Sequence, residues 1–257
     1  MIELLMTDID GCVLSDGIPH DQVAFFQNAS NEIRNYIQTD GSVKMPPIVF
    51  CTGRGSEYVH ALSQILDTRF GLPSIVENGS YLFWPENRRI VPHPCLFDKE
   101  SMVAEIKRLL LRNVVKKDIA DIIHGKEGSV SLKSTNFTVA ELKTIVQDAL
   151  PKELLLETFI THSSAAVDVT IKGVDKGSML KFYTECTGIK VENMLVIGDS
   201  ANDLPILDCA RIIACPSNAT AEVMDAVRKK NGFIAKNSCT EGFWEIFHFY
   251  KGRGWEC

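Results

Sequence analysis

Short apolar runs alternate with segments of helical periodicity near the start of this 257-residue chain. The apolar runs are Ile2 to Thr7, Ile48 to Cys51 and Ser74 to Glu77, and helical spacing is found between them at Val23 to Ile37 and Ser56 to Phe70. A β-α-β-α-β order predicts a parallel sheet with helices on both faces. We therefore expect an α/β protein with a doubly wound parallel sheet.

The same alternation returns near the carboxyl end of the chain. Strands are predicted at Met194 to Gly198, Ile212 to Cys215 and Gly232 to Ala235, and helices at Gly177 to Thr187, Asp203 to Cys209, Thr220 to Lys229 and Glu241 to Tyr250. These elements extend the first group. The two ends of the chain are therefore expected to build one sheet.

The middle of the chain has a different pattern. Alternating residues predict strands at Ser129 to Lys133, Leu155 to Thr161 and Ala165 to Ile171, the last two forming a hairpin around His162-Ser163-Ser164, and amphipathic helices are predicted at Met102 to Leu111 and Val139 to Leu150. We expect an inserted α+β domain at residues 83–172, which divides a core made of residues 1–82 and 173–257. Both junctions lie near polar motifs, so the insertion is expected to cover the ligand crevice and select the substrate.

Composition narrows the function classes. The net charge of −6 argues against a nucleic-acid binder, and no apolar run approaches the ~18 residues of a membrane span. The eight cysteines include no CxxC pair, and the first residues lack the basic and apolar regions of a signal peptide. We expect reduced thiols and a cytoplasmic protein, and the sequence leaves the oligomeric state open.

Two carboxylates follow the first predicted strand. Asp8 and Asp10 are two residues apart, so they leave the strand on the same face, close to each other. Such anions repel unless a cation lies between them or one of them keeps a proton. The carboxyl ends of strands in an open α/β sheet are also where ligands usually bind.

Three later segments supply polar and charged groups that can act together with Asp8 and Asp10. Thr52-Gly53-Arg54 follows the second strand, Lys176 begins a helix, and Gly198-Asp199-Ser200-Ala201-Asn202-Asp203 follows a late strand. Asp8 and Asp199 end two core strands and can reach one metal ion, and Asp203 can bind it directly or through water. Mg²⁺ favours such carboxylate ligands.

Each group has a chemical interpretation. Asp8 is a candidate nucleophile toward phosphorus and Asp10 a general acid and base. Thr52 and Gly53 can bind phosphate at the start of a helix, and the alternative is that Thr52 only caps that helix. Lys176 can offer its positive charge to the phosphoryl group, and the alternative is a solvated lysine at the surface. Arg54 binds a substrate anion or pairs with a surface acid, and Asn78 contacts substrate or only forms a turn.

In combination, Asp8-Ile9-Asp10-Gly11, Thr52-Gly53-Arg54, Lys176 and Gly198 to Asp203 resemble the four motifs of the haloacid dehalogenase (HAD) superfamily of phosphohydrolases. The insertion resembles the type-2 cap of Cof-like sugar phosphatases, sucrose-phosphate phosphatases and mannosyl-3-phosphoglycerate phosphatases. Cys12-Val13-Leu14 departs from the usual Thr-Leu or Val-Leu, and we assign Cys12 no catalytic role.

This resemblance implies a Mg²⁺-dependent phosphatase that hydrolyses a small phosphorylated metabolite, such as a sugar phosphate or related monoester, through an aspartyl-phosphate. It also implies residue roles. Asp8 is the nucleophile and a metal ligand, Asp10 is the acid/base whose carbonyl binds Mg²⁺, Asp199 and Asp203 belong to the metal site, and Thr52, Lys176, Asn202 and Asn78 lie at the phosphate or substrate.

Two other functions stay open. A phosphomutase would reuse the same aspartyl-phosphate, and it usually needs several cap arginines. The candidates in this stretch are Arg88, Arg89, Arg108 and Arg112. The second alternative is a non-catalytic protein that binds a phosphate ligand on the same scaffold. The His162-Ser163-Ser164 turn is a candidate substrate contact, and an exposed hairpin loop is its alternative.

Overall fold

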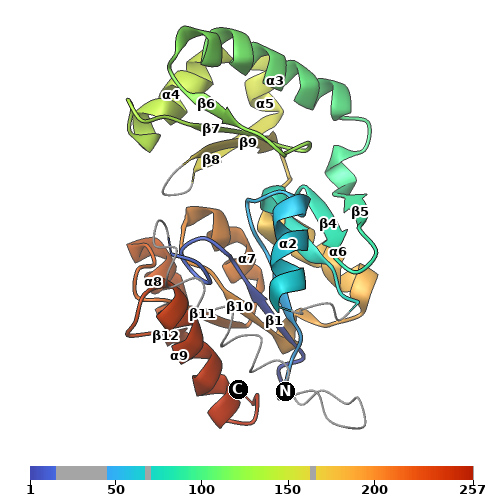
Figure 1. Cartoon of the computed structure of the whole chain (residues 1–257), viewed down its shortest axis with the longest axis vertical. Coiled ribbons are helices and arrows are strands. Elements are labelled where there is room, and N and C mark those ends of the chain that lie inside the picture. Colours follow the sequence, from blue (N-terminus) through green and yellow to red (C-terminus); the bar gives the residue numbers. More distant parts are fainter. Residues whose placement is uncertain (16–44, 67–70, 163–165, 257) are drawn as a thin grey trace.

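The computed structural model describes residues 1–15, 45–66, 71–162 and 166–256. The helix predicted at Val23 to Ile37 lies outside these ranges. The described chain forms two bodies stacked along the longest axis of the molecule (Figure 1). The lower body contains the parallel sheet and the upper body is a smaller α+β unit. No helix in the described ranges has the length and apolar character needed to cross a membrane.

The lower body is built on a five-stranded sheet in the order β12-β11-β10-β1-β2, and all its neighbouring strands are parallel. Its strands are β1 (Leu4–Thr7), β2 (Ile48–Phe50), β10 (Met194–Ile197), β11 (Ile212–Cys215) and β12 (Phe233–Ile234). Strand β1 pairs with β2 on one side and with β10, from the other end of the sequence, on its other side. The predicted parallel sheet is confirmed.

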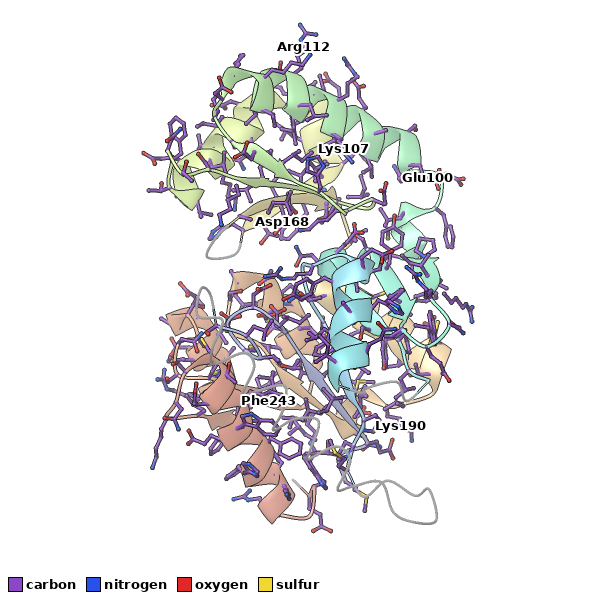
Figure 2. All side chains as sticks on the ribbon, viewed as in Figure 1. Glu100, Lys107, Arg112, Asp168, Lys190 and Phe243 are labelled. Carbon is purple, nitrogen blue, oxygen red and sulfur yellow. The ribbon has the colours of Figure 1, made fainter. Side chains whose placement is uncertain are left out.

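Alternate residues of each strand enter two separate hydrophobic clusters. Leu5 and Leu195 pack with helices α2 and α9, whereas Met6 and Val196 pack with α6, α7 and α8. These helices are α2 (Ser56–Leu66), α6 (Lys176–Thr187), α7 (Leu204–Cys209), α8 (Ala221–Lys229) and α9 (Cys239–Gly252). The period of two along each buried strand thus places helices on both faces, which is the doubly wound arrangement. Phe243 of α9 lies inside the lower body (Figure 2).

A small antiparallel sheet extends the lower body beside β2. It consists of β3 (Ser74–Val76), β4 (Tyr81–Trp84) and β5 (Arg89–Pro92), in that order. A parallel bridge between Cys51 and Ile75 joins it to the main sheet. Strand β3 matches the prediction closely, whereas β4 and β5 were not predicted.

The upper body contains a four-stranded sheet in the order β6-β7-β9-β8, with all pairs antiparallel. Its elements are β6 (Asp121–Ile123), β7 (Val130–Lys133), β8 (Thr158–His162), β9 (Val167–Ile171), α3 (Glu100–Asn113), α4 (Val139–Ala149) and α5 (Lys152–Leu156). The predicted pairing of the last two strands is confirmed, although residues 155 and 156 belong to a helix. Ser163 and Ser164 lie outside the described residues.

The helices of the upper body cover the face of its sheet that looks away from the lower body (Figure 1). The upper body has its own hydrophobic cluster there, which includes the buried residues Ile106, Leu110 and Val169. Asp168 points to the other face, toward the lower body, and Arg112 lies on the outer side (Figure 2). The sheet of the upper body therefore presents the Asp168 side chain to the lower body.

Short 3-10 turns connect several of these elements. They are η1 (Glu77–Gly79), η2 (Pro94–Leu96), η3 (Val115–Lys117), η4 (Val191–Asn193) and η5 (Ala201–Asp203). Two of them, η1 and η5, follow strands β3 and β10 at the upper edge of the core. They carry the polar residues Asn78, Asn202 and Asp203.

Candidate active site

The carboxyl edge of the parallel sheet brings two predicted aspartates together. Asp8 directly follows β1, and its backbone N–H donates to the carbonyl of Ile197 at 2.9 Å. Its side chain is almost fully buried, and its Oδ1 accepts the N–H of Ile9 at 2.7 Å. Asp199 lies two residues beyond the end of β10. Because β1 and β10 are parallel neighbours, both carboxylates reach the same edge.

Lys176 is the first residue of α6 and is fully buried. Its Nζ donates to Oδ2 of Asp8 at 2.9 Å and to Oδ1 of Asp203 at 2.6 Å. Asp175 caps the helix by accepting the N–H of Ser178 at 2.7 Å, which fixes the first turn that carries the lysine. The buried ammonium group therefore lies between two carboxylates, and their charges and hydrogen bonds compensate the cost of removing it from water.

Asp8, Asp199 and Asp203 form a group that can hold a metal ion. One carboxylate oxygen from each lies within 4.8 Å of the others. Burial, together with the charge of Asp203 and against the opposing charge of Lys176, raises the pKa of Asp8 to about 7 and the pKa of Asp199 to about 8. Three crowded, desolvated carboxylates gain from a cation, and hard divalent cations prefer oxygen ligands. The residues thus fit the metal site that the sequence predicts.

Asp203 also shapes the loop that carries this group. Its Oδ2 accepts the N–H of Asp199 at 2.9 Å and the N–H of Ser200 at 3.1 Å. Gly11 has a φ of +78°, and a Cβ there would lie 2.2 Å from Oδ2 of Asp199, so only glycine fits. The buried Cys12 thiol lies 4.0 Å from Asp199, and burial raises the pKa of this thiol well above its ordinary value. A protonated thiol agrees with the absence of a catalytic role for Cys12.

Asp10 and Arg54 form an ion pair at the mouth of the site. Nε of Arg54 donates to Oδ2 of Asp10 at 2.7 Å, and Nη2 donates to Oδ1 at 2.5 Å. The guanidinium also lies over the ring of Tyr58, 4.1 Å from its centre. The predicted acid/base and the predicted anion-binding residue therefore contact each other directly.

The other predicted substrate residues gather behind this pair. The hydroxyl oxygen of Thr52 accepts the N–H of Arg54 at 3.1 Å, and Nδ2 of Asn202 donates to Oδ1 of Asn78 at 3.1 Å. A Cβ on Gly53 would lie 3.0 Å from the same Asn78 oxygen. The Nδ2 of Asn78 is buried without a hydrogen-bond partner among the described residues. It is a buried donor next to Asn202 and Gly53, and a bound oxygen within reach would satisfy it.

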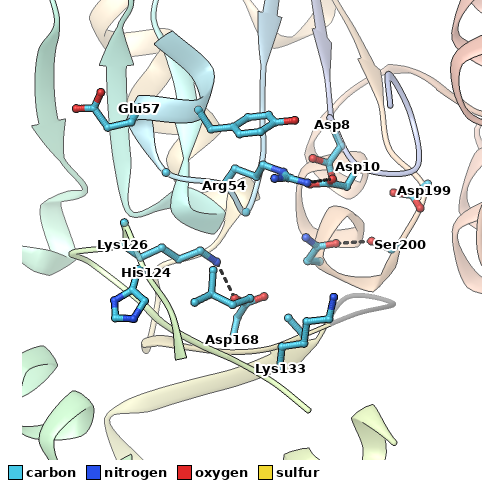
Figure 3. Close-up of a pocket in the computed structure, with 17 residues that line it drawn as sticks. Asp8, Asp10, Arg54, Glu57, His124, Lys126, Lys133, Asp168, Asp199 and Ser200 are labelled. Carbon is cyan, nitrogen blue, oxygen red and sulfur yellow. Dashed lines mark hydrogen bonds and ion pairs between the residues drawn. The ribbon is translucent and has the colours of Figure 1, made fainter. Parts of the chain in front are cut away.

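A pocket of about 460 Å³ opens between the two bodies (Figure 3). The core contributes Asp8, Asp10, Gly53, Arg54, Asp199 and Asn202, among others. The upper body contributes Ile123, His124, Gly125, Lys126, Lys133, Ala166 and Asp168. Thr52, Asn78, Lys176 and Asp203 are not among its lining residues. They contact the residues that are.

The sequence interpretation missed the residues that the upper body supplies. Nζ of Lys126 donates to Asp168 at 3.1 Å (Figure 3). Ser131 is hydrogen-bonded to both residues. A charged residue inside the apolar run Val167 to Ile171 was the available signal, because it marks the polar face of a strand. His162 was the predicted candidate, and it does not line this pocket.

Comparison with known proteins identifies the family of this chain. The family model described as haloacid dehalogenase-like hydrolase matches residues 111–246, which is more than half of the chain. The chain belongs to the haloacid dehalogenase-like hydrolases. The resemblance that the sequence motifs indicated is confirmed.

Curated relatives of this hydrolase include phosphoglycolate phosphatases. The protein of Methanothermobacter thermautotrophicus is 31% identical over 206 residues, which are 80% of this chain and 84% of the relative. The protein of Thermoplasma volcanium is 42% identical over 79 residues, 30% of this chain, and the alignment spans only 34% of that relative. The prediction of an enzyme of the phosphoric monoester hydrolase class is confirmed.

Solved structures support the fold of the hydrolase. The sucrose-phosphatase of Synechocystis, solved with sucrose and phosphate, has a TM-score of 0.64 at 16% identity, covering 98% of this chain and 99% of the other. The arrangement of both bodies is thus shared, and at this identity the likeness concerns the fold alone. The predicted resemblance to sucrose-phosphate phosphatases is confirmed at that level.

Proposed function

We propose that this hydrolase is a Mg²⁺-dependent phosphatase that cleaves small phosphate monoesters through an aspartyl-phosphate on Asp8. The main support for this proposal is the group of Asp8, Asp199 and Asp203 at the carboxyl edge of the sheet. The Lys176 ammonium lies between Asp8 and Asp203. Bound there, Mg²⁺ would neutralise the phosphoryl oxygens. The three side chains would hold it, together with the Asp10 carbonyl that the family resemblance implies.

In the first step, a carboxylate oxygen of Asp8 attacks phosphorus and the bond from phosphorus to the leaving oxygen breaks. Asp10 gives its proton to that leaving oxygen. In the second step, water attacks the aspartyl-phosphate and Asp10 takes the proton from the water. Phosphate then leaves and the Asp8 carboxylate is restored. Lys176 compensates the charge of Asp8 before attack and that of the phosphoryl group during transfer.

The pair of Asp10 and Arg54 gives the acid/base a fixed direction. Two hydrogen bonds from a planar guanidinium hold the carboxylate in one orientation. Protonation of Asp10 weakens this pair because it removes the charge that Arg54 binds. Arg54 is then available for an anionic group of the substrate, which is one of the two roles that the sequence leaves open for it.

Four further residues are proposed to bind the phosphate or the substrate. Thr52 can donate its hydroxyl hydrogen while its oxygen accepts from Arg54. Gly53 keeps the backbone open beside Asn78, whose buried Nδ2 needs an acceptor. Asn202 orients Asn78 through their hydrogen bond at 3.1 Å. A phosphoryl or ester oxygen supplies the acceptor that this group lacks.

The upper body is proposed to be the cap that selects the substrate. The predicted division at residues 83 and 172 divides β4, which pairs with β3 and packs in the core through Leu82. Leu96 and Val174, in contrast, belong to the hydrophobic cluster of the upper body. We therefore propose residues 93–174 as the cap and residues 1–92 and 175–257 as the core.

The cap side of the pocket favours substrates with a polar or anionic group beyond the phosphate. It carries His124, Lys126 and Lys133, and among the described residues Lys126 pairs with Asp168 whereas Lys133 forms no ion pair. Sugar phosphates and the phosphoglycolate of the relatives' names both fit this chemistry. We also propose a cytoplasmic location, which the buried thiols of Cys12, Cys51 and Cys215 support.

A phosphatase is favoured over a phosphomutase by the position of the arginines. Arg88 pairs with Glu57 and Arg108 pairs with Glu105, both at the surface. Neither of them lines the pocket, and nor do Arg89 and Arg112. The cap thus lacks the arginines that would hold a sugar phosphate while it turns round.

The test is hydrolysis of p-nitrophenyl phosphate, phosphoglycolate and a panel of sugar phosphates, with Mg²⁺ and with excess chelator. We expect release of inorganic phosphate that stops on chelation. Recovery of an isomeric sugar phosphate without phosphate release would identify a mutase. Undiminished turnover in excess chelator would contradict the metal role.

A further inference from the structure

Glu77 is a buried acidic residue that the proposed reaction does not use. It is 2% exposed and lies in η1, directly after β3, with a φ of +50°. Its backbone N–H donates to the carbonyl of Arg54 at 2.9 Å, and its carbonyl accepts the N–H and the hydroxyl of Ser80. Glu77 is therefore fixed at both backbone groups in a conformation that non-glycine residues rarely adopt.

The side chain of Glu77 crosses from the core to the cap. Its Oε2 accepts the backbone N–H of Glu127 at 2.9 Å and the N–H of Gly128 at 2.8 Å. Both donors belong to the loop between β6 and β7, which also carries Lys126. A single carboxylate oxygen of the core thus holds two consecutive amides of the cap.

The surfaces around this contact leave no space. A Cβ on Gly128 would lie 2.6 Å from the Cβ of Ser80, and a Cβ on Gly55 would lie 2.2 Å from the carbonyl oxygen of Gly125. Close approach without side chains at these positions is what allows the loop to dock on the core. The contact is therefore a fitted one, made by backbone groups of the cap and by core residues.

The docked loop places charge over the reaction site. Lys126 lines the pocket, where it donates to Asp168, and His124 and Gly125 of the same loop line it as well. We infer that Glu77 is a positioning residue that docks the β6–β7 loop on the core and thereby holds Lys126 and His124 over the substrate. This role rests on the proposed phosphatase function only where activity is the readout.

The direct test is hydrogen exchange at the amides of Glu127 and Gly128 in the full chain. Both are expected to be protected in the wild type. In Glu77→Ala they should exchange about tenfold faster or more, the scale of one to two net hydrogen bonds. The core strands β1 and β10 should keep their protection. Unchanged exchange at the two amides in a folded Glu77→Ala protein would overturn the assignment.

Two further variants separate docking from a general loss of structure. Glu77→Gln keeps the shape and one acceptor oxygen, so it should preserve protection, and loss equal to that in Glu77→Ala would overturn the role. Gly128→Ala disturbs the contact from the cap side and should expose the same amides even if Glu77→Ala does not fold. Glu127→Ala is the matched control, because it changes an exposed acid of the same loop and leaves its backbone N–H in place.

Kinetics then connect docking to the reaction. In Glu77→Ala, kcat/KM should fall further for phosphoglycolate than for p-nitrophenyl phosphate, and Glu77→Gln should restore the ratio of the two. An unchanged ratio together with rapid exchange would overturn the positioning of Lys126 and His124. Should no phosphate ester be hydrolysed by the wild type, the proposed phosphatase function fails, while hydrogen exchange still decides whether Glu77 docks the loop.

Discussion

At the scale of single residues, the site separates two aspartates by their surroundings. Asp8 is buried against Lys176, whereas Asp10 is partly exposed and pairs with Arg54. The first arrangement suits a nucleophile held at one place, and the second suits a group that exchanges protons with substrate and water. The two residues should therefore fail in different ways when each becomes an amide.

Asp8→Asn should abolish turnover and leave the protein folded. The amide has nearly the same shape, and Nζ of Lys176 can still donate to its oxygen, but the amide is a poor nucleophile. Phosphate release should fall to the background of the assay while circular dichroism and thermal unfolding show a native fold. Trapping of the wild type with beryllium fluoride should modify Asp8. Substantial turnover by the folded variant would mean that another group attacks phosphorus.

Asp10→Asn should slow both steps, by about 10²–10⁴-fold for esters with a poor leaving group. Formation of the aspartyl-phosphate should suffer less with p-nitrophenyl phosphate, because nitrophenolate scarcely needs a proton. Rapid-quench measurements of the first turnover would show this as a burst that persists for the nitrophenyl ester and disappears for an alkyl ester. Equal losses for both esters would exclude Asp10 as the acid.

At the scale of elements, hydrophobic pattern predicted the core better than the cap. Strands β10 and β11 are short apolar runs between helices, and this context identifies them. The three strands β4, β5 and β6 lack such a context. Arg89–Pro92 ends in proline and is half exposed, and Asp121–Ile123 has only three residues. Leu155 and Leu156 end a helix where the start of a strand was predicted, because periodicity cannot separate the two in so short an apolar run.

The contact between η1 and the β6–β7 loop should weaken as the pH rises. Burial raises the pKa of docked Glu77 to about 7, although the N–H groups of Gly128 and Glu127 and the charge of Lys126 oppose this shift. The charge of Glu127 adds to it, and the Tyr81 hydroxyl nearby stays neutral because its own pKa is raised to about 12. Undocked, the carboxyl returns to its ordinary pKa near ~4.3.

The docked state consequently binds more protons, so docking is fully favoured below the ordinary pKa and weakens as the pH rises toward 7. Exchange at the amides of Glu127 and Gly128, corrected for intrinsic rates, should increase between pH 5 and 8. Glu77→Gln should remove this increase, since its side chain has no charge in that range. A pH dependence that persists in Glu77→Gln would assign it to another group.

At the scale of the whole molecule, the core part of the site was predictable because topology assembles it. Asp8, Thr52 and Asp199 each follow a parallel strand, and the carboxyl ends of such strands must meet at one edge. The cap part was not predictable in the same way. Lys126, Lys133 and Asp168 come from the β6–β7 loop, β7 and β9, and only the position of the upper body over the core brings them to the pocket. That position depends on contacts such as those of Glu77.

The metal site should also control the stability of the whole chain. Burial and mutual repulsion raise the pKa of Asp8 to about 7 and that of Asp199 to about 8, from ordinary values near ~4 in the unfolded chain. Raised values mean that the folded state binds more protons than the unfolded state. Without metal, the free energy of unfolding should therefore decline as the pH rises from about 4 through about 8.

Mg²⁺ should oppose this decline, because it binds the ionised carboxylates of the folded state and competes with their protons. The stabilisation by saturating Mg²⁺ should be larger at pH 8 than at pH 5, reaching ~2.7 kcal/mol at a concentration a hundredfold above Kd. Urea unfolding at both pH values, with Mg²⁺ and with chelator, measures it. Asp199→Asn should lose most of the gain, whereas Glu192→Gln, a change at an exposed acid before β10, should keep it. An equal gain at both pH values, or one that survives in Asp199→Asn, would show that Mg²⁺ binds elsewhere.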